Sequence, residues 1–187
     1  MLAAGAGSRM GGPKALMSVG GRPWWRVQSE RLKRVGFEQV WLVSPEVRAA
    51  IEGESDAPAN LIEADSAEPM FDTVLRGVKS LDAGATLGVF VQPVDVPVAE
   101  RWVWMELFEV GGVAVPRSGG RTGHPIYLPW EWVEAEMLGR ELGSGGRLDA
   151  LVRGMRKEID VPDGDVAVNL NSPGELERWL LESEERA

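Results

Sequence analysis

Two positively charged side chains stand in a glycine-rich stretch at the start of the chain. The stretch reads Leu2-Ala3-Ala4-Gly5-Ala6-Gly7-Ser8-Arg9-Met10-Gly11-Gly12-Pro13-Lys14. A glycine-rich turn exposes backbone N–H groups that converge on phosphate oxygens. Arg9 can grip a phosphate with two parallel hydrogen bonds, and Lys14 can act as a point charge. The residue types therefore favour a phosphate-binding loop, with a flexible N-terminal turn as the alternative.

The spacing of this stretch does not fit two common phosphate motifs. A P-loop requires Gly-Lys-Ser/Thr, whereas alanine follows Lys14. A dinucleotide fingerprint requires Gly-x-Gly-x-x-Gly after a full strand, and Gly5, Gly7 and Gly11 have the wrong last spacing. A redox enzyme with a dinucleotide cofactor is therefore disfavoured.

Acidic and imidazole groups further along the chain are weaker candidates taken alone. Asp95 follows the apolar run 87–91, at the place where an α/β sheet collects ligands, although it could be only a turn aspartate. Asp65 stands before a helix-period segment and could reach a ligand or simply face solvent. His124 is the only histidine, and a lone histidine is more often structural than catalytic. The acidic cluster at 160–165 lacks calcium-loop spacing and predicts a polar turn.

The composition limits the classes of protein and partner. The 187 residues carry a net charge of −9 and no cysteine, which excludes disulfides, zinc–thiolate sites and a cysteine nucleophile. No apolar run approaches the ~18 residues of a membrane helix. Residues 1–37 hold seven basic side chains against one acidic, which suggests a local anion site on an acidic body. We expect a cytoplasmic protein with no nucleic-acid or membrane partner.

Elements that could position these groups alternate along the chain. Short apolar runs predict strands near 40–43, 60–62, 87–91, 113–115, 125–128 and 166–170. Amphipathic stretches predict helices near 23–35, 45–52, 69–81, 98–109, 130–138, 146–156 and 173–184. This alternation predicts an α/β fold, with a mostly parallel sheet covered on both faces, in a single domain over 1–187. Leu2 and Ala3 run straight into glycine, so the first strand is shortened.

Five motifs in order resemble the nucleotidyltransferases of the molybdenum-cofactor family, the MobA-like NTP transferases. The first is the glycine-rich stretch ending at Lys14. The others are Met70-Phe71-Asp72-Thr73-Val74-Leu75-Arg76-Gly77, Val91-Gln92-Pro93-Val94-Asp95-Val96-Pro97, Gly123-His124-Pro125-Ile126-Tyr127 and Val168-Asn169-Leu170-Asn171-Ser172-Pro173. The resemblance spans nearly the whole chain. It implies a three-layer, Rossmann-like nucleotidyltransferase fold of the GT-A type.

The resemblance also implies roles for individual residues. Backbone groups near the first strand would hold the base and ribose, with Asp65 and Thr73 as further nucleotide contacts. Arg9 and Lys14 would bind the triphosphate and carry catalysis together with Asp95. His124 and Pro125 would lie near the acceptor. Mg²⁺ would be held by Asp95 and Asn171, the latter a position where the cytidylyltransferase branch more often has aspartate. The implied nucleotide-binding set is Leu2, Ala3, Ala4, Gly5, Gly7, Arg9, Lys14, Asp65, Thr73 and Asp95.

The implied reaction is transfer of a nucleoside monophosphate from a nucleoside triphosphate to a phosphorylated acceptor of the molybdopterin type, with release of pyrophosphate. Ala4 is typical of the cytidylyl branch, whereas the motif around Asn171 is closer to the guanylyl branch, so CMP is favoured over GMP. Two alternatives stay open. One is a non-catalytic carrier that delivers the molybdenum cofactor to a molybdoenzyme. The other is a transferase acting on a sugar phosphate or another phosphorylated acceptor.

Overall fold

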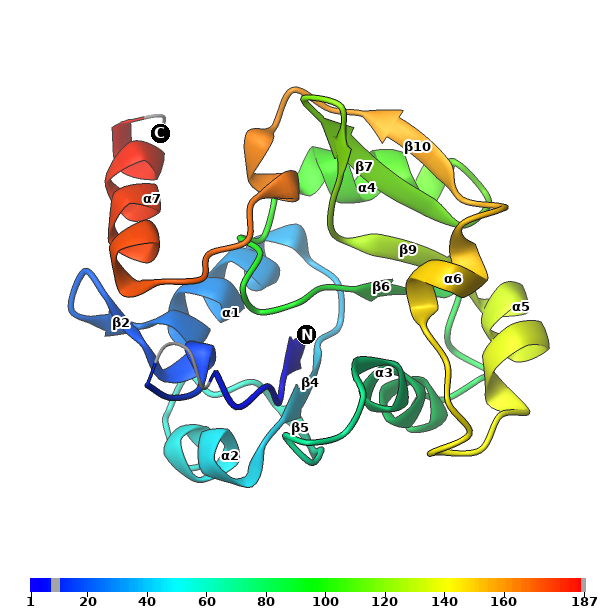
Figure 1. Cartoon of the computed structure of the whole chain (residues 1–187), viewed down its shortest axis with the longest axis horizontal. Coiled ribbons are helices and arrows are strands. Elements are labelled where there is room, and N and C mark those ends of the chain that lie inside the picture. The colour runs from blue at the N-terminus through cyan, green and yellow to red at the C-terminus, as the bar shows by residue number, and fades with distance from the viewer. Residues whose placement is uncertain (8–10, 186–187) are drawn as a thin grey trace.

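The centre of the protein consists of two sheets that are joined by an isolated bridge. The computed structural model describes residues 1–7 and 11–185. Two sets of strands, β5-β4-β1 and β6-β9-β7-β10, meet where Leu2 pairs with Pro93, in the parallel sense (Figure 1). The strands of these two sheets are β1 (Leu2–Ala3), β4 (Val40–Val43), β5 (Asn60–Glu63), β6 (Gly88–Val91), β7 (Ala114–Ser118), β9 (Ile126–Pro129) and β10 (Lys157–Asp160).

Strand direction places chain segments from both halves at one edge of the joined sheets. All pairings along this path are parallel except those of β9, which runs antiparallel to β6 and β7. Ile126 at the start of β9 therefore lies opposite Val91 at the end of β6. The expectation of a mostly parallel sheet is confirmed. Three short strands lie outside this path: β2 (Ser18–Val19) pairs with β3 (Arg22–Pro23), and β8 (Arg121–Thr122) pairs with β7.

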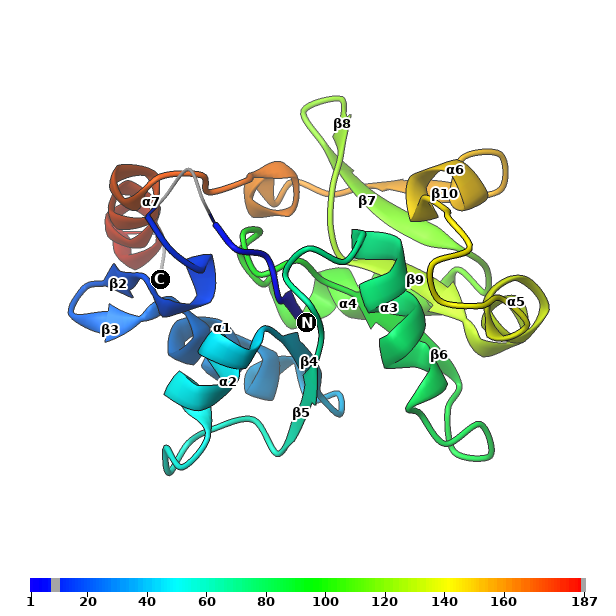
Figure 2. The ribbon, with the colours of Figure 1, turned by 60° about the horizontal axis from the view of Figure 1, so that its bottom comes forward.

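Helices cover both faces of the sheet and form two separate cores. One core takes buried side chains from α1 (Trp24–Val35), α2 (Pro45–Ile51), α4 (Arg101–Glu109) and α7 (Pro173–Glu185). The other takes them from α3 (Met70–Lys79), α5 (Trp130–Val133), the π-helical turn η3 (Glu134–Leu138) and α6 (Leu148–Val152). This is the expected three-layer arrangement. Helix α7 packs beside the β2–β3 hairpin (Figure 2).

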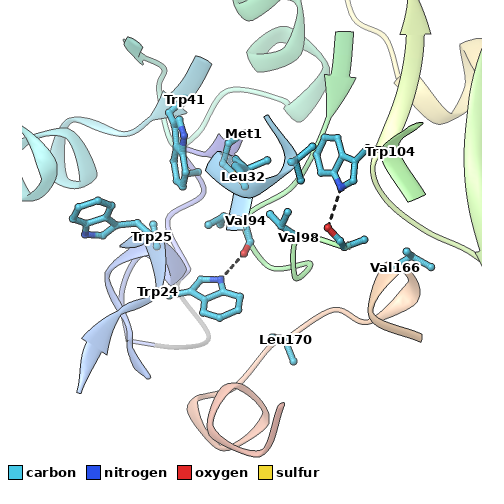
Figure 3. Close-up of a cluster of buried hydrophobic side chains, with 14 of the residues drawn as sticks. Met1, Trp24, Trp25, Leu32, Trp41, Val94, Val98, Trp104, Val166 and Leu170 are labelled. Atoms are coloured by element: carbon cyan, nitrogen blue, oxygen red, sulfur yellow. Dashed lines mark hydrogen bonds between the residues drawn. The ribbon is translucent and has the colours of Figure 1, made fainter. Parts of the chain in front are cut away.

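Buried tryptophans hold the first core together around the loop after β6 (Figure 3). Trp24 is fully buried, packs edge-on against Trp179 at 5.3 Å, and donates a 2.6 Å hydrogen bond from Nε1 to the Val94 carbonyl. Trp25 and Trp41 are buried as well. Packing is thus the role of the Trp24-Trp25 pair, because neither side chain is open to a ligand.

The first strand is as short as the sequence predicts, and an apolar cavity lies beyond its start. This cavity, of about 360 Å³, separates β4 from β6 and is lined by side chains including Leu32, Phe37, Val78 and Phe90. The Met1 amine is buried at its boundary and donates to the Val40 carbonyl at 2.8 Å. Burial lowers the pKa of this amine from 8.0 to about 5, because charge is costly away from water. β1 thus joins the two halves of the sheet only near their carboxyl ends.

Near the C-terminus, the structure corrects one expected strand and adds one strand that was not expected. The run 166–170 is not a strand: Asp163 accepts a hydrogen bond from the Asp165 N–H and begins the 3₁₀ turn η4 (Gly164–Ala167). The turn agrees with the expectation for the acidic cluster. The strand beside it is instead β10 (Lys157–Asp160), whose three charged residues are exposed because the strand lies at the sheet edge.

Candidate active site

A cavity of about 250 Å³ opens where β1, β5 and β6 end. Its wall combines the glycine-rich loop, the segment before α3 and the loop after β6. Most of the nucleotide-binding residues predicted from the sequence meet here. The lining residues are Leu2, Ala4, Gly5, Gly7, Lys14, Asp65, Ser66, Glu68, Met70, Thr73, Pro93, Val94 and Asp95.

The glycine-rich loop requires glycine at one position for a steric reason. Gly7 has φ +59°, and a Cβ built on it would lie 2.0 Å from the Gly12 carbonyl oxygen. Only glycine adopts this conformation and allows the close approach without strain. The loop then enters the 3₁₀ turn η2 (Lys14–Leu16), which begins after Pro13 and presents Lys14 to the cavity. Arg9 lies outside the described residues.

Three predicted residues from distant parts of the chain meet at the edge of this cavity. Lys14 Nζ donates to Asp95 Oδ2 and to Asn171 Oδ1, each at 2.8 Å. The Lys14 and Asp95 side chains are 20% and 26% exposed, so the ion pair is partly shielded from water. One ammonium group therefore holds together one carboxylate oxygen and one amide oxygen.

Buried side chains of α1 fix the loop that carries Asp95. The Gln28 amide is fully buried, and its Nε2 donates to the carbonyls of Val94 at 3.0 Å and Val96 at 2.7 Å. Its Oε1 accepts from the Val98 N–H at 3.0 Å. Together with the Trp24 bond to Val94, these contacts satisfy backbone groups on either side of Asp95. The position of the carboxylate is thus set by the core.

Asn171 is oriented by its own neighbours. The Leu170 N–H donates to the Asp95 carbonyl at 2.8 Å, which brings the C-terminal segment to the loop after β6. Asn171 Nδ2 donates to the Asn169 carbonyl at 3.0 Å, so the amide oxygen faces Lys14. The Asn171 N–H donates to Glu175 and lowers the pKa of that carboxyl. The cluster therefore joins three segments of the sequence.

The other end of the cavity holds an acidic side chain that the sequence reasoning missed. Glu68 is mostly buried; its carboxylate accepts from Arg76 at 2.7 Å and lies 3.5 Å from the Thr73 hydroxyl. Asp65 also lines the cavity, while its Oδ1 accepts from the Ala67 N–H at 2.9 Å. Glu68 stands two residues before α3, and Arg76 lies two turns further along it. No local pattern in the sequence marks Glu68, because its pairing with Arg76 depends on the folded helix.

The Gly-His-Pro segment lies outside the lining of this cavity. His124 Nδ1 is 3.4 Å from the Val91 carbonyl, and the His124 N–H donates to the Val166 carbonyl at 2.8 Å. Burial lowers the pKa of His124, an effect opposed by the Val91 carbonyl and the Asp95 carboxylate. A Cβ on Gly123 would lie 1.7 Å from the Val166 oxygen, so glycine is required there. This segment orders the loops around the site, and Pro125 is buried within it.

Comparison with known proteins identifies the family. The model of the MobA-like NTP transferase domain matches residues 1–158. The chain belongs to this family. No curated protein matches it.

Solved structures share the fold of this MobA-like domain at low identity. A homologue of Mycobacterium tuberculosis Rv0371c from Mycobacterium sp. strain JC1 superposes with a TM-score of 0.78 at 20% identity, over 100% of this chain and 96% of that one. Rv0371c from M. tuberculosis H37Rv in complex with manganese superposes with a TM-score of 0.70 at 22% identity, over 97% of this chain and 96% of that one. Molybdopterin-guanine dinucleotide biosynthesis protein A from Archaeoglobus fulgidus superposes with a TM-score of 0.67 at 18% identity, over 98% of this chain and 97% of that one.

Of the residues predicted for this MobA-like site, Ala3 is buried and does not line the cavity, in contrast to Leu2 and Ala4 on either side. No cluster of three or more acidic, histidine or cysteine side chains that could hold a metal occurs in residues 1–7 and 11–185. Asp95 and Asn171 nonetheless offer two converging oxygens, and Mg²⁺ commonly takes only one or two protein ligands. The donor set thus fits a hard divalent cation. Within the same described ranges, no helix has the length and apolar character needed to cross a membrane.

Proposed function

We propose that this MobA-like domain transfers a nucleoside monophosphate from a nucleoside triphosphate to a phosphorylated acceptor of the molybdopterin type, releasing pyrophosphate. One observation carries the proposal: Lys14 meets Asp95 and Asn171 at the edge of a cavity bounded by the glycine-rich loop. A cation for phosphate and oxygens for a metal are the groups that nucleotidyl transfer requires.

Catalysis by these residues rests on alignment and charge. The backbone of the glycine-rich loop holds the nucleotide so that a phosphate oxygen of the acceptor attacks the α-phosphorus. Lys14 stabilises the negative charge that develops there and on the leaving pyrophosphate. A phosphate monoester is already a nucleophile near neutral pH, so no general base is needed. This agrees with the position of His124, which lies outside the lining of the cavity and contacts the carbonyls of Val91 and Val166.

Asp95 and Asn171 are proposed to hold Mg²⁺. When bound, the ion would supply a Lewis acid that neutralises phosphate charge. The manganese complex of the structural neighbour Rv0371c supports a divalent cation in this fold. Because the Asn171 oxygen is neutral, the two proposed protein ligands would bring a single negative charge to the ion, from Asp95.

CTP is favoured over GTP as the donor, because Ala4 at the cavity wall is typical of the cytidylyl branch. The wall also carries the Glu68 carboxylate, which can accept a hydrogen bond from the exocyclic amino group that cytosine and guanine share. The acceptor is proposed from the family resemblance and from the molybdopterin-guanine dinucleotide protein among the structural neighbours. A cytoplasmic location and a molybdoenzyme as recipient of the product belong to the same proposal.

A thermal shift experiment with CTP, GTP, ATP and UTP, each with and without Mg²⁺, tests the proposal. A ligand at 100 times its Kd adds about 2.7 kcal/mol, which raises the Tm by roughly 5–10 °C in a protein of this size. We expect a Mg²⁺-dependent rise with CTP that Asp95→Ala removes. The matched control Asp149→Ala changes an exposed carboxylate paired with Arg147 and Arg153. It is expected to leave the rise intact.

Release of pyrophosphate distinguishes the transferase from a carrier and from other acceptors. With molybdopterin and CTP, the transferase releases one pyrophosphate for each acceptor consumed. Binding of the nucleotide-bearing cofactor without pyrophosphate release would favour the carrier. Release with a sugar phosphate alone would move the acceptor to that class. No shift with any nucleotide would contradict the proposal as a whole.

A further inference from the structure

The Lys14 ammonium is bonded to the same two side chains that are proposed to hold the metal. Its Nζ is 2.8 Å from Asp95 Oδ2 and 2.8 Å from Asn171 Oδ1. These are the two oxygens that the proposed function gives to the divalent cation. An ammonium and a metal ion compete for the same lone pairs and repel each other at such distances. In this arrangement, one positive charge already satisfies both oxygens.

Of the three groups, the lysine side chain is the one free to move. The backbone around Asp95 is held by the Gln28 and Trp24 bonds and by the Leu170 N–H. The Asn171 amide is held by the Asn169 carbonyl. Lys14 has its backbone fixed in η2, but its four-carbon side chain lines the open cavity and has no other hydrogen-bond acceptor. This last statement applies to the described part of the chain.

We propose that Lys14 and the divalent cation exclude each other at the Asp95–Asn171 oxygens, and that a bound polyphosphate relieves this exclusion by drawing Lys14 to its own oxygens. The proposal rests on the metal assignment of the proposed function. The site then takes the cation together with a polyphosphate and binds the cation alone weakly. By linkage, the cation strengthens polyphosphate binding by the same factor.

The exclusion also assigns Lys14 a role before the chemical step. In the free protein, its charge offsets Asp95 in a site that is only partly exposed to water. An unpaired carboxylate in such a place would attract stray cations. Lys14 holds the Asp95 and Asn171 oxygens in place and moves away from them only when a triphosphate binds.

Binding of Mn²⁺ alone, followed by electron paramagnetic resonance, tests the exclusion without any turnover. We expect Lys14→Met to bind Mn²⁺ at least about tenfold more tightly than the unaltered chain. The matched control is Lys33→Met, which removes the same charge from an exposed lysine whose Nζ contacts the Asp56 carbonyl. Equal Mn²⁺ affinity in Lys14→Met and the unaltered chain would overturn the inference, and so would an equal gain in Lys33→Met.

A second variant tests the exclusion from the side of the phosphate and keeps the net charge. In EDTA, Asn171→Ala releases Lys14 from one of its two partners, so inorganic tripolyphosphate is expected to bind a few times more tightly, as measured by calorimetry. Unchanged or weaker binding would contradict the proposal. The circular dichroism spectrum of each variant shows whether it is folded.

The double variant Lys14→Met, Asp95→Ala separates this inference from the proposed function. Loss of the Mn²⁺ binding that Lys14→Met shows places the metal at Asp95, as both proposals require. Retention of that binding would remove the metal assignment and the inference with it. Loss of Mn²⁺ binding in Asp95→Ala, with no gain in Lys14→Met, would overturn the exclusion alone.

Discussion

The two halves of the molecule, which meet where Leu2 of β1 pairs with Pro93 after β6, contribute opposite chemistry. The N-terminal side supplies the glycine-rich loop and Lys14, within a segment of seven basic side chains and one acidic. The C-terminal side supplies oxygens, from Asp95 after β6 and Asn171 before α7. Neither side forms the site alone. The groups that can bind an anion come from one half and the oxygens that can bind a cation come from the other. They meet only when β1 bonds to both halves of the sheet.

Lys14→Ala tests the N-terminal side. The fold is expected to persist, because the side chain is partly exposed and contacts only the site. The barrier for nucleotidyl transfer is expected to rise by roughly 3–4 kcal/mol, the cost of losing one donor to the transition state. Pyrophosphate release under saturating substrates gives the rate. A turnover near that of the unaltered protein would remove Lys14 from the mechanism.

Gln28→Leu tests how the core positions the C-terminal side. The substitution leaves the Val98 N–H buried without its partner, at a cost of about 1–3 kcal/mol in the free energy of unfolding, and removes one of the two donors from each of the Val94 and Val96 carbonyls. The loop carrying Asp95 is expected to shift, so Mg²⁺-dependent nucleotide binding weakens as well. Gln28→Glu is the comparison: it keeps an acceptor for the Val98 N–H but loses the donor to the two carbonyls, so it is expected to be destabilised as well. Full stability in Gln28→Leu would show that the loop carrying Asp95 keeps its position without the Gln28 hydrogen bonds.

His124→Gln is expected to have the smallest effect. Glutamine can keep a contact to the Val91 carbonyl, and the backbone bond to Val166 is unaltered. Turnover is expected to change by less than about fivefold, or ~1 kcal/mol, with no change in its pH profile near neutrality. Loss of a pH-dependent limb in the profile would instead make His124 a general acid or base.

The sequence predicted the parts of this site that depend on local motifs. The loop to Lys14, the strand end before Asp95 and the α3 segment with Thr73 have residue types tied to their chemistry, and all line one cavity. The place of Glu68 in the cavity wall was not predicted, because Glu68 is held there by Arg76 and the two residues pair only once α3 has formed.

The wrong expectations about secondary structure concern segments whose backbone hydrogen bonds are made with distant parts of the chain. Val166, Val168 and Leu170 alternate as in a strand, yet the Val166 carbonyl and the Leu170 N–H are used by His124 and Asp95. In β10 the sequence Lys-Glu-Ile-Asp gives no apolar signal, because an edge strand pairs on one side only and leaves its charges in water. Such tertiary partners are absent from any local pattern.

The apolar cavity between β4 and β6 bears on how the protein responds to pressure. Its walls are mostly apolar, and apolar walls hold water weakly. Unfolding removes such space, which makes the volume change of unfolding negative and larger in magnitude than packing alone would give. Hydrostatic pressure is therefore expected to loosen the walls of this cavity before it disrupts the two packed cores.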